Sequence, residues 1–216
     1  MKVPKIEFLW SWVYQMEVHS QNVKTEEYDY ESYEKYVLDF IKKIEKEWNK
    51  KGNEILRYIG EITGLKWKEE KIKCYVIKIS TLIPFSYPLT IPIQFETVEG
   101  KIYVLSVERY IDMLFHELIH NIFIQNEKET EKYFEYILNE KFNEEEFNTV
   151  IHIPVHAIHK KIFMKFFNKK RLELEIEKSS YYPNYKRSWE IVNKKGEDSI
   201  IKELKDYVDT KPKEKA

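Results

Sequence analysis

The chain has 216 residues and a mass of 26.5 kDa, the size of one domain or of one core with a small helical appendage. A hydrophobic content of 43% excludes a disordered chain, and five Gly and seven Pro exclude collagen-like and linker-rich architectures. The formal net charge of −1 produces no global field that would attract nucleic acid or an anionic membrane.

The sequence favours a cytoplasmic protein. No apolar run approaches the roughly 18–20 residues of a membrane span, and the first residues lack the apolar stretch of a signal peptide. The one cysteine, Cys74, has no partner for an internal disulfide, which fits a reducing compartment. The chain has 31 Glu against 6 Asp and 32 Lys against 4 Arg. This bias is typical of thermophile proteins, although an AT-rich genome would also enrich lysine codons.

The first part of the chain is predicted to be helical up to about residue 65. Residues 1–26 are rich in Trp and Tyr but show no clear period. Apolar residues between Glu31 and Asn49 recur at spacings of three and four, which predicts a helix with one apolar stripe. We expect Gly52 to break this helix and a second helix to follow over residues 53–62.

The middle of the chain is predicted to form a small, mostly antiparallel sheet. Alternating and β-branched residues indicate strands over 71–80, 90–97 and 101–105. Three prolines, Pro84, Pro88 and Pro92, crowd the residues just before and within the second stretch, so part of this region is expected to be an edge strand or loop.

The rest of the chain is predicted to be mainly helical. Ser106 can cap a helix that runs to about Ile124 and stops near Asn126. Further helices are expected over residues 129–139, 149–167, 186–192 and 198–208. The fold class is therefore α+β: one domain with an N-terminal helical part (about 1–65), a sheet with an active-site helix (about 66–126) and a helical C-terminal part (about 127–210).

The most informative motif is H-E-x-x-H, formed by His116, Glu117 and His120. Residues four apart share one helical face, so the two imidazoles can converge on one tetrahedral zinc ion. Zinc lowers the pKa of a bound water towards about 7, and the carboxylate of Glu117 can accept its proton. The composition gives only about 0.02 such matches by chance, so two purely structural histidines are the weaker interpretation.

A catalytic zinc site needs a third protein ligand. Phe123 and Asn126 stand where the extended H-E-x-x-H-x-x-G-x-x-H motif has Gly and His, so the ligand must come from further along the chain. His152, His156 and His159 lie at about 0°, 40° and −20° on a helical wheel and share one face that is expected to point inward. His156, central in this stripe, is the preferred ligand, and His152 is the second choice. The rival is a downstream carboxylate, for which the candidates are Glu131, Glu135 and Glu144–Glu146.

A strand, a helix with His116-Glu117-x-x-His120 and a later helix that offers a ligand resemble the zincin class of zinc metallopeptidases over about residues 90–165. The separation between His120 and the later helix is similar to the gluzincin arrangement, in which the third ligand is Glu; a His there departs from that pattern. The resemblance implies that His116 and His120 bind Zn²⁺ and that Glu117 is the general base.

We therefore expect a zinc metallopeptidase that hydrolyses a peptide or protein substrate, with no nucleic-acid or membrane partner. An edge strand near 91–97 or 101–105 could hold an extended substrate. The alternative is a catalytically inactive zincin-like module kept for metal or partner binding. A weaker third possibility is a zinc hydrolase that acts on a non-peptide amide, because the zinc chemistry is shared.

Overall fold

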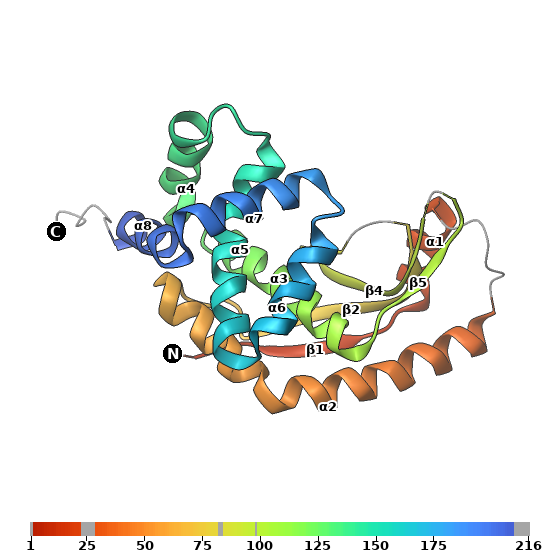
Figure 1. Ribbon diagram of the computed structural model, residues 1–216. Coiled ribbons are helices and arrows are strands. Elements are labelled where there is room, and N and C mark those ends of the chain that lie inside the picture. The colour runs from red at the N-terminus through yellow and green to blue at the C-terminus, as the bar shows by residue number, and fades with distance from the viewer. Residues whose placement is uncertain (1, 23–28, 82–83, 98, 210–216) are drawn as a thin grey trace. The chain divides into compact units, whose positions relative to one another are not determined.

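The computed structural model describes residues 2–22, 29–81, 84–97 and 99–209 (Figure 1). The chain divides into two compact units, each assembled from separated stretches. We call residues 3–53 and 69–121 the sheet unit, and residues 1–2, 54–68 and 122–216 the helical unit. The α+β class is confirmed, with one small sheet, flanking helices and a helical C-terminal part.

The sheet has five strands within the described residues. In chain order they are β1 (Lys5–Leu9), β2 (Lys71–Ser80), β3 (Phe85–Ser86), β4 (Leu89–Glu96) and β5 (Ile102–Val104). The strand order is β1-β2-β4-β3, and β5 also pairs with β4.

The sheet is mixed rather than mostly antiparallel. β1 pairs with β2 and β2 pairs with β4 in parallel, whereas β3 and β5 both run antiparallel to β4. The difference arises in two places: β1 is a strand that the sequence pattern did not indicate, and β2 pairs with β4 in parallel although both strands were predicted. The connection from β1 to β2 contains helices α1 (Trp12–Asn22) and α2 (Tyr30–Thr63), and a long helical crossover is the usual link between parallel strands.

The proline-rich stretch contains both a central strand and an outer one. Pro92 lies inside β4 opposite Ile77 of β2, while Pro84 and Pro88 flank the short outer strand β3. Because β4 has partners on both sides, the segment 91–97 is not an edge that could accept an extended peptide. Of the two segments that the sequence offered as an edge for an extended substrate, only the second, which forms β5, is still a candidate.

The pairing of β1 with β2 ends at Tyr75, and a side chain of helix α1 bonds the backbone of β2 beyond that point. The side chain of Gln15 accepts a hydrogen bond from the backbone N–H of Lys78 at 2.6 Å and donates one to the carbonyl of Ile79 at 3.4 Å. Gln15 is fully buried, so these bonds satisfy an amide that would otherwise be costly to bury.

Helix α2 is one continuous helix where the sequence predicted two. Gly52 lies inside it, and a Cβ added there would stand 2.2 Å from Cε2 of Trp48 one turn earlier. The glycine therefore makes room for the buried indole of Trp48 and does not end the helix. The division between the two units falls within α2, after Asn53.

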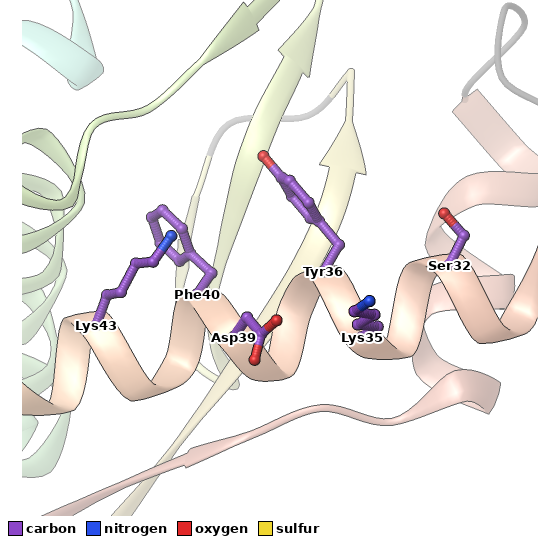
Figure 2. A pocket seen from close by; sticks show the side chains of 6 residues that line it. All are labelled: Ser32, Lys35, Tyr36, Asp39, Phe40 and Lys43. Atoms are coloured by element: carbon purple, nitrogen blue, oxygen red, sulfur yellow. The ribbon is translucent and has the colours of Figure 1, made fainter.

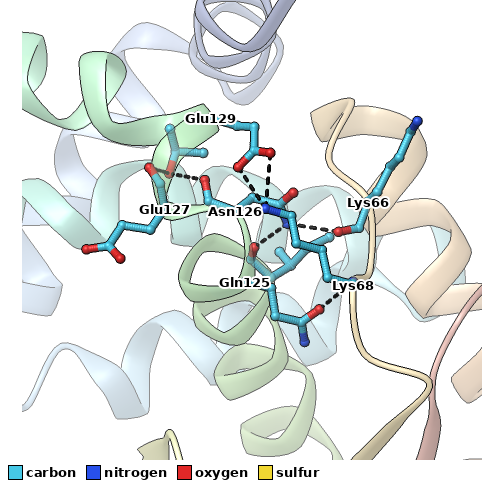
Figure 3. A network of polar contacts seen from close by, with 8 residues as sticks. Lys66, Lys68, Gln125, Asn126, Glu127 and Glu129 are labelled. Carbon is cyan, nitrogen blue, oxygen red and sulfur yellow. Dashed lines mark hydrogen bonds and ion pairs between the residues drawn. The ribbon is translucent and has the colours of Figure 1, made fainter.

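Helix α3 (Val107–Gln125) begins and ends where the sequence predicts. The Ser106 hydroxyl accepts a hydrogen bond from the N–H of Arg109 at 3.2 Å, as an N-cap does. At the other end, Asn126 Nδ2 donates to the carbonyls of Lys66 at 2.9 Å and Ile122 at 2.8 Å (Figure 3). The backbone N–H of Lys68 also donates a hydrogen bond to the side-chain oxygen Oε1 of Gln125 at 2.7 Å. The side chains of Gln125 and Asn126 thus hold the segment before β2 against the end of α3.

The helical unit is built around α5. Its elements are α4 (Glu127–Tyr136), the π-helical turn η1 (Ile137–Lys141), α5 (Phe147–Phe166), α6 (Lys169–Ser179), α7 (Pro183–Lys195) and α8 (Glu197–Asp209). Helices α6, α7 and α8 all pack against α5. Helix α6 was not among the predicted helices, because its sequence carries few apolar residues.

Pro154 lies inside α5. The helix begins at Phe147, so Pro154 is beyond the first turn, and the carbonyl of Val150 loses the helical donor that residue 154 would supply. Burial of twelve α5 side chains against neighbouring helices offsets this loss.

Among the described helices, none combines the length and apolar character that a membrane crossing needs.

Candidate metal centre

Helix α3 places His116 and His120 one turn apart, as the motif spacing predicts. Their ring centroids are 5.1 Å apart, with an angle of 63° between the ring planes. His116 is 8% exposed and His120 is partly exposed. Leu114, Phe115 and Leu118 on the same helix are fully buried, so α3 is anchored by its apolar side chains and can hold the two imidazoles in place.

Glu117 lies in an environment that suits a general base. Its carboxylate is 8% exposed, and Oε2 accepts a hydrogen bond from the Ser86 hydroxyl at 2.6 Å. Burial raises the pKa of Glu117 to about 7, and the hydrogen bond from Ser86 acts in the opposite direction. A carboxyl group with this pKa can take up and release a proton near neutral pH.

A second side chain of α3 also reaches β3. Asn121, one turn after Glu117 and 1% exposed, donates from Nδ2 to the backbone carbonyl of Ser86 at 2.9 Å. Ser86 and Asn121 were not predicted as site residues. Ser86 lies 31 positions before its carboxylate partner Glu117. The one sequence signal that could have indicated a shared partner is the four-residue spacing of Glu117 and Asn121, which places them on one helical face.

In the helical unit, the predicted inward stripe on α5 is confirmed: His152 is 6% exposed, and His156 and His159 are each 1% exposed. His152 Nδ1 lies 2.6 Å from the carbonyl oxygen of Asn148, which can only accept, so Nδ1 carries the proton and Nε2 the lone pair. Burial lowers the pKa of His152 to about 4, so the ring is neutral at pH 7.

His156 is held by different neighbours. Its Nδ1 lies 2.9 Å from the hydroxyl oxygen of Ser188, and its ring stacks on Trp189 with centroids 4.2 Å apart and planes within 6°. Trp189 in turn donates from Nε1 to Ser179 at 2.9 Å. His156 is therefore part of a buried polar and aromatic network that involves α5, α6 and α7.

His116, His120 and His152 lie close enough to bind one metal ion, because one ligand atom of each is within 4.8 Å of the others. The third member of this group is His152, the second choice from the sequence, and not His156. The carboxylate candidates are also outside the group: Glu131, Glu135, Glu144 and Glu146 are exposed, and Glu145 pairs with Arg187 at 2.6 Å. These statements cover the described part of the chain.

A cavity of about 510 Å³ in the sheet unit has a different lining. Its walls are formed by residues of α2, namely Ser32, Lys35, Tyr36, Asp39, Phe40 and Lys43 (Figure 2). No histidine contributes to this lining, so the cavity supplies no ligand to the histidine group.

Comparison with known proteins adds no relative: no protein-family model matches the chain, and neither a curated protein nor a solved structure matches it. The zincin resemblance stays a prediction that rests on the H-E-x-x-H motif and its place in the sequence.

Proposed function

We propose that this protein is a zinc metallopeptidase in which His116, His120 and His152 bind Zn²⁺ and Glu117 is the general base. The observation that carries the proposal is the grouping of the three histidine ligand atoms within 4.8 Å of one another, with Glu117 next to His116 in the sequence. The proposal gives His152 the role that the sequence analysis gave to His156.

The residues fit this metal chemically. Three neutral imidazoles form a common ligand set of catalytic zinc, and such sites keep a fourth position for water or substrate. The hydrogen bond from His152 Nδ1 to a backbone carbonyl is the outer contact that metal-binding histidines usually make, because it fixes the tautomer and the ring orientation. A low pKa adds to the fit, since protonation competes with metal binding.

Zinc, when bound, would lower the pKa of water and polarise a peptide carbonyl. Glu117 would accept the proton of the attacking water on its carboxylate and then deliver that proton to the leaving amine. The substrate class is a peptide or protein, and a cytoplasmic location belongs to the same proposal.

The experiment compares Glu117→Gln with Glu108→Gln, a matched change at an exposed position of the same helix. Zinc content is measured by mass spectrometry, and hydrolysis is measured with quenched fluorescent peptide libraries. We expect both variants to bind zinc like the wild type, and Glu117→Gln alone to lose hydrolysis by about 10²- to 10⁴-fold.

Turnover at the wild-type rate by Glu117→Gln would refute the assigned base. A zinc-loaded wild type that cleaves no peptide and binds no hydroxamate would instead favour the inactive metal-binding module, because a closed site has no position for that inhibitor.

A further inference from the structure

Ser86, in the sheet unit, contacts the proposed base directly through its side chain. It belongs to β3, a strand of only two residues, and is followed by the strongly exposed Tyr87. Its hydroxyl oxygen lies 2.6 Å from Glu117 Oε2, which is shorter than the usual O–H···O distance to a neutral acceptor. The acceptor is a nearly buried carboxylate, so the contact is a charge-assisted hydrogen bond when Glu117 is ionised.

The position of Ser86 is fixed from two sides. Asn121 donates to its carbonyl from α3, and Ser86 pairs with Leu89 in the antiparallel turn between β3 and β4. In the same turn, Phe85 pairs with Thr90, whose Oγ1 lies 2.8 Å from the hydroxyl of Tyr14 in α1. The backbone that carries the Ser86 hydroxyl is thus held by the fold before any substrate binds, which is what preorganisation of a catalytic group needs.

We propose that Ser86 is a positioning residue that fixes the orientation of the Glu117 carboxylate for proton transfer. A glutamate has three side-chain torsions, and the last of them is broad, so helix geometry alone does not orient the carboxylate plane. The bond at Oε2 fixes that plane and leaves Oε1 for the attacking water. The expected effect of Ser86 on kcat rests on the proposed function. The hydrogen bond from Ser86 to Glu117, in contrast, is present in the metal-free protein as well.

The test compares Ser86→Ala, which removes the hydroxyl, with Ser86→Thr, which keeps it. In the zinc-loaded enzyme we expect Ser86→Ala to lower kcat about 10- to 100-fold, the scale of a small misplacement of a catalytic group. Its KM and zinc content should stay at wild-type values, and Ser86→Thr should restore kcat. Thermal unfolding of all three proteins checks that they are folded.

A second readout needs no activity. In the zinc-free protein, NMR relaxation of the ¹³C-labelled Glu117 side chain, assigned with Glu117→Gln, reports how rigidly the carboxylate is held. We expect high order in the wild type and Ser86→Thr, and reduced order in Ser86→Ala. Unchanged order in Ser86→Ala, or equal loss of kcat in both variants, would overturn the inference. A zinc-loaded wild type without hydrolysis would overturn the proposed function, and the relaxation data would still decide whether Ser86 holds Glu117.

Discussion

The buried, neutral state of His152 predicts acid destabilisation of the zinc-free protein. An unfolded histidine takes up its proton with a pKa of about 6.5, whereas burial lowers the folded value to about 4. Between these values the unfolded state binds more protons, so acid favours unfolding. The contribution of His152 to stability is therefore complete above pH 6.5 and is lost as the pH falls through about 4.

The two pKa values differ by about 2.5, which corresponds to about 3 kcal/mol at 1.36 kcal/mol for each pH unit. Solvent screening lowers this free-energy contribution only slightly, because His152 is 6% exposed. Glu117 acts in the opposite direction, since its raised pKa favours the folded state as the carboxyl is protonated below pH 7. A comparison with His152→Phe cancels the Glu117 term and isolates the histidine.

The assay is urea unfolding of chelator-treated wild type and His152→Phe at several pH values between 7.5 and 4. We expect the stability of the wild type relative to the variant to fall by about 3 kcal/mol over this range, most of it below pH 6. A difference between the two proteins that stays constant within about 0.5 kcal/mol from pH 7.5 to 4 would refute the buried, neutral state of His152.

Two further substitutions test the packing of each unit. Gly52→Ala should lower the free energy of unfolding by about 1–3 kcal/mol, because the new Cβ collides with the Trp48 ring; a thermal unfolding curve that matches the wild type would show that the indole moves without cost. Ser188→Ala should cost about 1–3 kcal/mol, because it removes the hydrogen-bonding partner 2.9 Å from buried His156 Nδ1. Here urea unfolding is the measurement, and a loss below about 0.5 kcal/mol would mean that another group replaces the hydroxyl.

The sequence predicted the elements that have a strong period. Strands β2, β4 and β5 and helix α3 lie within a residue or two of the predicted ranges, because alternation and three–four spacing are local properties. Strand β1 was missed because its pairing with β2 is parallel and joins residues 66 positions apart. Gly52 was misinterpreted because a local rule treats glycine as a helix end, whereas here it accommodates Trp48.

The sequence indicated the candidate metal centre except for its third ligand, which could have been any of the three histidines of α5. The motif spacing located His116, Glu117 and His120, and the helical wheel placed the α5 stripe inward. The wheel could not rank His152 above His156, because both share one face. Their partners distinguish them: Ser188 and Trp189 of α7 hold His156, while a carbonyl of α5 itself orients His152. Ser86 was unpredictable for the same reason, since its contact with Glu117 depends on how β3 folds onto α3.

The three-histidine metal centre is tested directly by the zinc content and zinc affinity of three tag-free proteins: the wild type, His152→Phe and His156→Phe. Both variants keep an aromatic ring at a buried position, so they differ chiefly in which imidazole is lost. We expect about one zinc per chain in the wild type and in His156→Phe, and loss of zinc in His152→Phe. Zinc retained in His152→Phe but lost in His156→Phe would contradict the assigned ligand, and a wild type that binds no added zinc would contradict the metal centre itself.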